Sequence, residues 1–141
     1  MTNQIKCFFI DDDEEDATLF SIMMKEVNKD ALLITAINGS FALQKLNADQ
    51  TFIPDFIFLD LNMPVMGGKE CLRELKKIPR LEAVPIIIYS TSDNDNDMQE
   101  TKQAGAAHYV IKPFDPENLG IILQKLFQKE DLPFLIREPV K

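Results

Sequence analysis

The sequence predicts a single α/β domain, built as a doubly wound sheet of five parallel strands with helices on both faces. Five short apolar runs alternate with helical segments along the chain, and each run has the length of a buried strand. Helical crossovers between strands produce parallel sheets that are covered on both faces. The 141 residues, 45% of them hydrophobic, suffice for one packed core.

The predicted elements follow one another as five strand–helix units. Apolar residues recur at helical spacing most clearly in the first and fifth helices. The fourth helix, near residues 94–104, carries only Met98 as a large apolar residue, so we expect it to be the least firmly packed. Gly105 follows it, where a left-handed residue would end a helix. The predicted strands are residues 5–10, 32–36, 56–59, 85–89 and 108–111.

Composition excludes several classes of function. The formal net charge of -8 opposes broad contact with nucleic acid or an anionic membrane, because phosphates would be repelled. The start of the chain lacks the apolar stretch of a signal peptide, and no later run approaches a membrane span. Cys7 and Cys71 lie in apolar segments without metal-ligand spacing, which indicates buried, reduced thiols. These features predict a cytoplasmic protein.

Polar side chains follow four of the predicted strands. The first strand leads into three aspartates at 11–13, the third into Asp60, the fourth into hydroxyls at 90–92 and the fifth into Lys112. In open α/β sheets the functional crevice lies beyond the carboxyl ends of the strands. We therefore expect carboxylates, hydroxyls and one ammonium to meet at a single edge of the sheet.

Asp60 interrupts an apolar run, where a solvated acid is not expected. A nearly buried carboxylate needs a partner. An acidic helix N-terminus is an alternative explanation for residues 11–16, but it does not account for Asp60. If Asp11, Asp12 and Asp60 converge, their repulsion raises their pKa values or recruits a hard cation, and oxygen ligands suit Mg²⁺. We predict a Mg²⁺ pocket with Asp60 as its reactive group.

Four short motifs follow the predicted strands in order, and together they resemble the receiver domain of two-component response regulators. The resemblance covers about residues 5–127 and implies a flavodoxin-like fold with strand order 2-1-3-4-5. The motifs are Ile10-Asp11-Asp12-Asp13, Leu59-Asp60-Leu61-Asn62-Met63-Pro64-Val65-Met66-Gly67-Gly68, Tyr89-Ser90-Thr91 and Tyr109-Val110-Ile111-Lys112-Pro113-Phe114.

The resemblance implies that Asp60 accepts a phosphoryl group from a phosphohistidine, with Mg²⁺ or Mn²⁺ bound beside it. Asp11, Asp12, Asp60 and the backbone carbonyl of Asn62 would hold the cation. Lys112 and the Ser90 hydroxyl would stabilise charge on the transferred group, which is what phosphoryl transfer requires of a protein. The protein would assist its own phosphorylation and dephosphorylation without being an enzyme in the ordinary sense.

The same resemblance assigns three further features. Ser90 and Tyr109 match the switch pair, in which the hydroxyl moves toward the phosphoryl group and the ring turns inward. Asn62 and Ser92 occupy the positions that tune hydrolysis, and neither is an obvious base, so we expect a long-lived phosphoryl state. In the family the bond between Lys112 and Pro113 is cis.

The donor implied by the resemblance is a sensor histidine kinase or a histidine phosphotransfer protein. Residues 79–85 and 90–93 are most similar to the single-domain regulators of phytochrome-type kinases. We expect a receiver domain at 1–128 and a tail at 129–141 without an effector domain, so that the signal leaves through a downstream protein on the fourth helix, fifth strand and fifth helix. The tail could fold back, mediate a homodimer or stay disordered.

Two alternatives belong to other classes of function. A phosphatase resembling the haloacid dehalogenase family would use Asp11 and Asp13, which have the right spacing, but Asp60 would then have no role. A receiver-like interaction module that is never phosphorylated would not need the reactive positions, yet all of them are filled.

Overall fold

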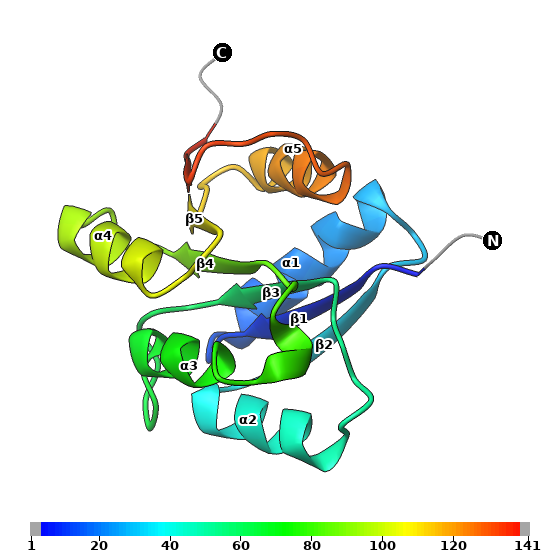
Figure 1. Ribbon diagram of the computed structural model, residues 1–141. Helices are drawn as coiled ribbons and strands as arrows, with labels where there is room; N and C mark the ends of the chain where they lie inside the picture. The colour runs from blue at the N-terminus through cyan, green and yellow to red at the C-terminus, as the bar shows by residue number, and fades with distance from the viewer. Residues whose placement is uncertain (1–3, 139–141) are drawn as a thin grey trace.

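The computed structural model describes residues 4–138 as a six-stranded parallel sheet between two layers of helices (Figure 1). The five predicted strands are present in the predicted order, because each is an apolar run buried between helices. A sixth strand extends the sheet beyond β5. The strands are β1 (Lys6–Ile10), β2 (Leu32–Ala36), β3 (Phe56–Leu59), β4 (Ile86–Ser90), β5 (His108–Ile111) and β6 (Leu135–Ile136), in the order β2-β1-β3-β4-β5-β6.

Within residues 4–138, five α-helices and one 3₁₀ turn connect the strands. Asparagine and aspartate side chains cap four of the helices by accepting backbone N–H groups of the first turn. Gly105 follows α4 with φ +104°, the left-handed stop that the sequence predicts. The helices are α1 (Glu14–Val27), α2 (Gly39–Ala48), α3 (Gly68–Leu75), α4 (Asp95–Gln103) and α5 (Pro116–Phe127), and the 3₁₀ turn is η1 (Pro79–Leu81).

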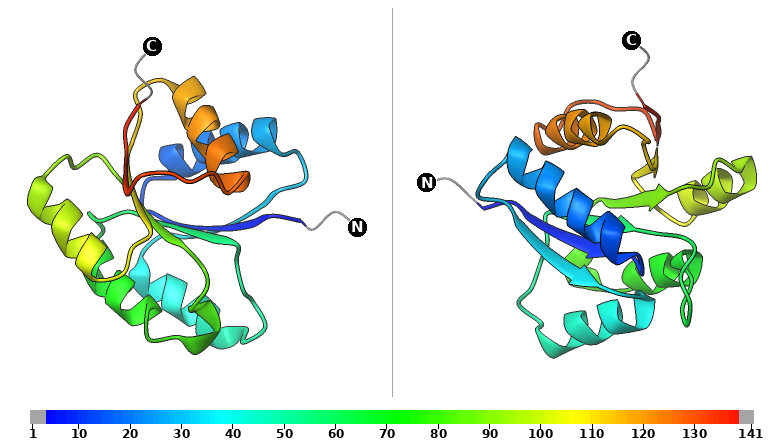
Figure 2. Two further views of the ribbon diagram at one scale, coloured as in Figure 1. Left: turned by 45° about the horizontal axis from the view of Figure 1, so that its top comes forward. Right: turned by 180° about the vertical axis from the view of Figure 1, so that it is seen from behind.

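Each face of the sheet has its own core. Helices α1 and α5 cover one face, where Phe20 packs against Phe9 and Phe58. Helices α2, α3 and α4 lie on the opposite side, as the two views in Figure 2 show. The edge of the sheet formed by the carboxyl ends of the strands is therefore packed from both faces. This packing fixes the positions of the ends of β1, β3, β4 and β5 relative to one another.

Helix α4 is the least firmly packed, as its sequence predicts. Its buried residues are only Met98 and Thr101. The Thr101 hydroxyl turns back to donate to the carbonyls of Asp97 and Met98 within the helix. Polar contacts from its exposed faces must therefore supply much of what positions this helix.

The tail folds back along β5, which was one of the three outcomes left open by the sequence. The Tyr109 N–H donates to the Phe134 carbonyl at 2.8 Å, and Leu135 and Ile136 pair with Tyr109 and Val110. Ile136 is buried in the same core as α5. The sixth strand thus covers the outer edge of β5, and the last three residues of the predicted tail lie outside the described part of the chain.

Two sequence predictions about environment can be compared with residues 4–138. No helix in that range combines the length and the apolar character needed to cross a bilayer. Cys7 and Cys71 are free and buried, and burial raises the pKa of both thiols to about 12. They are packing residues, as predicted.

Candidate functional site

The sheet register brings two aspartates together at the carboxyl ends of β1 and β3. Ile10 pairs with Leu59, so the next residue of each strand, Asp11 and Asp60, reaches the same edge. The Asp60 N–H donates to the Ile10 carbonyl at 2.9 Å. Both carboxylates are buried, with Asp11 5% exposed and Asp60 6% exposed. Their proximity is a consequence of parallel pairing between two adjacent strands.

Asp12 completes an acidic cluster with these two residues. One carboxylate oxygen of each of Asp11, Asp12 and Asp60 lies within 4.8 Å of the others. Two of these acids are buried and Asp12 is exposed, so the cluster opens to solvent on one side. Hard oxygen donors at this separation fit Mg²⁺ or Mn²⁺, which accept carboxylates and keep waters in their remaining positions.

Lys112 reaches into the cluster from the end of β5. Its Nζ lies 3.0 Å from Asp11 Oδ2, 2.7 Å from Asp16 Oδ2 and 4.0 Å from Asp60 Oδ1. The ammonium also lies 5.4 Å from the centre of the Tyr89 ring. Lys112 is therefore held mainly by Asp11 and Asp16, with Asp60 at the limit of an ion pair.

Asp16 is the residue that sequence reasoning missed. It was explained as one more acid in the first turn of α1, a position that the helix dipole already favours. Its position could have indicated the contact: the first turn of α1 follows the aspartate run directly, so a side chain there can reach the carboxyl ends of the strands. Three carboxylates, those of Asp11, Asp16 and Asp60, thus lie within 4.0 Å of the ammonium, and Asp12 joins the cluster beside Asp11 and Asp60.

Burial and mutual repulsion perturb the titration of the cluster. Burial, with the added charge of Asp11, raises the pKa of Asp60 to about 6, although Lys112 and backbone N–H groups oppose the rise. Burial also raises the pKa of Asp11. For Lys112, burial acts to lower the pKa, but the bonds to Asp16 and Asp11 prevail and raise it. Lys112 thus stays charged. The ionised form of Asp60 is disfavoured in this pocket, so a bound cation would stabilise it.

Asp13 faces away from this cluster. Its side chain accepts from the Glu15 and Asp16 N–H groups at 2.9 and 3.1 Å and caps α1. Asp11 accepts from the Asp13 N–H at 2.9 Å. The phosphatase alternative requires Asp11 and Asp13 to act as a pair of reactive carboxylates. The capping role of Asp13 does not support such a pair.

A family model for the response regulator receiver domain matches residues 7–124. The chain belongs to this family. The resemblance carried by the four motifs is thereby confirmed, and the fold class with it. Receiver domains are phosphoacceptors of two-component signalling rather than enzymes with a separate substrate.

Several solved structures are similar to this receiver over most of its length. The phosphorylated cyanobacterial phytochrome response regulator RcpA is 26% identical with a TM-score of 0.80, over 89% of this chain and 93% of that chain. The Mn²⁺-bound response regulator Rcp1 is 26% identical with a TM-score of 0.77, over 92% and 98%. CheY4 of Vibrio cholerae, a chemotaxis regulator, is 30% identical with a TM-score of 0.76, over 88% and 99%. The predicted similarity to phytochrome regulators is confirmed.

Curated relatives are longer proteins. A probable transcriptional regulator, ycf29 of Porphyra purpurea, is 33% identical over 97 residues, which is 69% of this chain and 45% of the relative. The regulator PhoP of Bacillus subtilis is 27% identical over 127 residues, which is 90% of this chain and 50% of the relative. The receiver spans about half the length of these relatives, and the activities in their names belong to the longer proteins.

The two residues at the predicted switch positions are linked through Ser92. Ser90 is fully buried at the end of β4, and its Oγ accepts from the Ser92 N–H at 3.2 Å. Tyr109 is also fully buried, and its hydroxyl donates to the Ser92 carbonyl at 2.9 Å. The ring of Tyr109 therefore lies inward, behind Ser90, with its hydroxyl fixed to the loop that follows β4.

The loop after β3 wraps closely around Asp60. The Gly68 N–H donates to the Leu61 carbonyl at 2.9 Å, and a Cβ on Gly68 would lie only 2.2 Å from the Asp60 carbonyl oxygen. Asn62 is exposed beside this loop, and its N–H helps to hold the Asp60 carboxylate. Val65 adopts φ 72°, a left-handed conformation that is strained for a β-branched residue. Glycine is required at 68, whereas Val65 stores strain.

One implication of the resemblance is wrong for this chain. No peptide bond within residues 4–138 is cis, so the bond between Lys112 and Pro113 is trans. The Lys112 N–H donates to the Ser90 carbonyl at 2.8 Å, which fixes the start of this loop as a continuation of the sheet. The ammonium reaches the cluster from this trans backbone.

Proposed function

We propose that this receiver accepts a phosphoryl group on Asp60 from a phosphohistidine, in a reaction that depends on Mg²⁺ or Mn²⁺. The observation that carries the proposal is the convergence of Asp11, Asp12 and Asp60 within 4.8 Å, beside the ammonium of Lys112. Apolar side chains would stabilise the fold better at these positions, because buried like charges repel one another. The cluster is therefore explained by function rather than by stability.

The chemistry assigns one atom to each part of the transfer. A carboxylate oxygen of Asp60 attacks the phosphorus, the phosphorus–nitrogen bond of the donor histidine breaks, and the imidazole keeps the electron pair. A raised pKa makes the Asp60 carboxylate a better nucleophile, provided that it is ionised when the donor arrives. The product is an acyl phosphate.

Positive charge must balance the transferred group. Lys112 lies 4.0 Å from Asp60 and can contact a phosphoryl oxygen after a small movement. The Ser90 hydroxyl, at the end of the adjacent strand β4, is the second donor. A divalent cation held by Asp11, Asp12, Asp60 and the Asn62 carbonyl would supply the remaining charge neutralisation when bound.

The partners follow from this chemistry. A sensor histidine kinase or a histidine phosphotransfer protein supplies the phosphoryl group. A downstream protein then contacts α4, the β5 edge with its added strand β6, and α5. The similarity to RcpA, a cyanobacterial phytochrome response regulator, supports a phytochrome-type kinase as the donor.

Intact mass spectrometry tests the proposal. The protein is incubated with Mg²⁺ and acetyl phosphate, or with a phosphorylated kinase, and we expect wild type to gain the mass of one phosphoryl group. Asp60→Asn and Asp11→Asn should gain none. Asp13→Asn is the matched control, because asparagine still caps α1. Label that persists in Asp60→Asn, or that disappears in Asp13→Asn alone, would contradict the assignment.

The same experiment, followed over time, measures the lifetime of the phosphoryl group. Asn62 and Ser92 lie at the positions that tune hydrolysis, and neither provides a base for water. We expect the label to persist for minutes or longer in the isolated protein. A half-life of seconds would show that another residue activates the water.

A further inference from the structure

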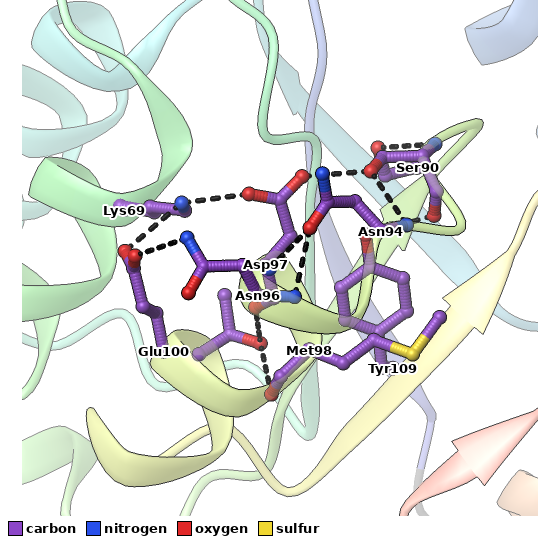
Figure 3. A network of polar contacts seen from close by, with 10 residues as sticks. Lys69, Ser90, Asn94, Asn96, Asp97, Met98, Glu100 and Tyr109 are labelled. Carbon is purple, nitrogen blue, oxygen red and sulfur yellow. Dashed lines mark hydrogen bonds and ion pairs between the residues drawn. The ribbon is translucent and has the colours of Figure 1, made fainter.

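An ion pair joins α3 to α4 outside the acidic cluster (Figure 3). Lys69 Nζ lies 2.7 Å from Asp97 Oδ1 and 2.9 Å from Glu100 Oε2. Lys69 is on the first turn of α3, and both acids are on the face of α4 that points toward it. Because α4 buries only Met98 and Thr101, polar connections such as this one help to fix the position of the helix.

The position of Lys69 is set by the segment that carries Asp60. Its neighbour Gly68 is bonded to the Leu61 carbonyl, and no side chain could fit between Gly68 and the Asp60 carbonyl. The backbone of Lys69 therefore cannot shift independently of Asp60. The ammonium extends from this anchored turn to α4.

Asp97 uses its second oxygen on the loop after β4. The Ser92 hydroxyl donates to Asp97 Oδ2 at 2.7 Å, while Lys69 occupies Oδ1. Ser92 in turn donates its N–H to Ser90 Oγ at 3.2 Å and accepts the Tyr109 hydroxyl at 2.9 Å through its carbonyl. A continuous set of bonds thus runs from Lys69 through Asp97 and Ser92 to both Ser90 and Tyr109.

Helix capping alone does not account for this arrangement. An acid in the first turn of α4 would stabilise the helix wherever its side chain pointed. Asn94 already caps α4 by accepting from the Asn96 and Asp97 N–H groups, and the first turn also contains Asp95. Asp97 differs in that each of its oxygens is bonded to a different element of the fold.

We propose that Lys69, Asp97 and Ser92 form a latch that positions the loop 91–94 for phosphoryl transfer. The latch keeps the Tyr109 hydroxyl bonded to the Ser92 carbonyl, so the ring stays inward. It also fixes the position of Ser90 Oγ at the end of β4 through the Ser92 N–H. Lys69 and Asp97 are positioning residues in this scheme, since neither touches the reacting atoms. The effect on reaction rests on the proposed function of Asp60.

The expected effect is modest, because the latch is partly exposed. The Lys69 and Asp97 side chains are 31% and 25% exposed, which places the ion pair between surface and buried pairs. Breaking it should lower about fivefold the ratio of molecules that keep the bond from the Tyr109 hydroxyl to the Ser92 carbonyl to molecules that lose it, which corresponds to about 1 kcal/mol. A change of this size is measurable by spectroscopy and leaves the fold intact.

Fluorine NMR tests the latch without any phosphoryl group. The chain has two tyrosines, so protein labelled with fluorotyrosine gives two resonances, and Tyr109→Phe assigns them. We expect the Tyr109 resonance to shift or broaden in Lys69→Met and in Asp97→Asn, with Tyr89 unchanged. Lys69→Arg, which keeps the charge, should restore the wild-type position. An unchanged Tyr109 resonance in both Lys69→Met and Asp97→Asn overturns the latch.

The control is an ion pair of equal length that joins nothing to α4. Lys77 lies 2.7 Å from Glu74 on the exposed end of the α3 segment. Lys77→Met should therefore leave the Tyr109 resonance unchanged. A shift in Lys77→Met as large as that in Lys69→Met would mean that charge alone is responsible, and would overturn the proposal.

Phosphorylation kinetics with acetyl phosphate and Mg²⁺ provide the second measurement. Lys69→Met and Asp97→Asn should each lower the rate about fivefold, and the double variant should be no slower than either. Equal rates in wild type and variants, or effects that multiply, overturn the link to the reaction. If wild type takes up no phosphoryl group, the proposed function of Asp60 fails, while the NMR result still decides whether the latch exists.

Discussion

Replacing Asp60 with asparagine should stabilise the metal-free protein at neutral pH. Asp60 is 6% exposed, and its negative charge faces Asp11 across the site. Asparagine keeps nearly the same shape and can still accept the backbone hydrogen bonds, but it carries no charge. The substitution removes the reactive group and also an unfavourable electrostatic interaction, so stability and function should change in opposite directions.

The magnitude follows from the pKa. Burial and Asp11 raise the pKa of Asp60 from 3.8 to about 6. At about 1.4 kcal/mol per pKa unit, the ionised carboxylate destabilises the folded state by about 3 kcal/mol. Because the folded state binds the proton more tightly, wild type is relieved of this cost below about pH 4 and loses stability as the pH rises toward 6. Asp60→Asn lacks the contribution of residue 60 to this pH dependence, while that of Asp11 remains in both proteins.

Urea unfolding followed by circular dichroism measures the difference. In buffer with a chelator, Asp60→Asn should exceed wild type by about 3 kcal/mol in free energy of unfolding at pH 7, and the two curves should meet near pH 4. Adding Mg²⁺ should raise the free energy of unfolding of wild type and reduce the difference from the variant, since the cation binds the carboxylate cluster of the folded state. Equal stability at pH 7 without metal, or a gap that persists at pH 4, would refute the reasoning.

Three further predictions concern the segments that frame the site. Val65→Gly should raise the free energy of unfolding by about 1 kcal/mol, since glycine adopts the left-handed conformation at φ 72° without strain; a decrease in thermal stability would contradict this. Gly68→Ala should lower the free energy of unfolding by about 1–3 kcal/mol, because the new Cβ collides with backbone atoms. Gly67→Ala is the control, since a Cβ there would lie 3.7 Å from its nearest neighbour. Equal losses of stability in the two variants would be inconsistent with the packing. Ile136→Ala should cost about 2 kcal/mol and speed hydrogen exchange of the Tyr109 N–H, and unchanged exchange would mean that strand β6 is not held by this side chain.

Most of the fold could be predicted because its signals are local. Strands β2, β3 and β5 have the predicted bounds, and the other two of the predicted five differ by one residue at their ends, since buried parallel strands are continuous apolar runs. Strand β6 could not be predicted, because two residues carry no periodicity. It forms only because β5 would otherwise be an open edge, and that is a property of the assembled sheet.

The site was predictable where the strand ends determine it. Asp11 and Asp60 follow two adjacent strands, so their convergence follows from topology alone. Asp16 was not predictable, because an acid in a first turn already has a sufficient explanation. The bonds of Ser92 were missed for a related reason: they depend on where α4 lies relative to α3, and a weakly amphipathic helix gives no such information.

The inclusion of Asp16 changes the electrostatic argument for a cation. With all groups ionised, four carboxylates against the ammonium of Lys112 leave three negative charges in one pocket, and Asp11 and Asp60 are nearly excluded from water. A divalent ion reduces the excess to one. A phosphoryl group on Asp60 then adds negative charge, and the Lys112 ammonium can move toward it by breaking its 2.7 Å contact with Asp16. Asp16 thus gives Lys112 a second place to bind, and the exchange between the two partners is a movement that phosphorylation itself would drive.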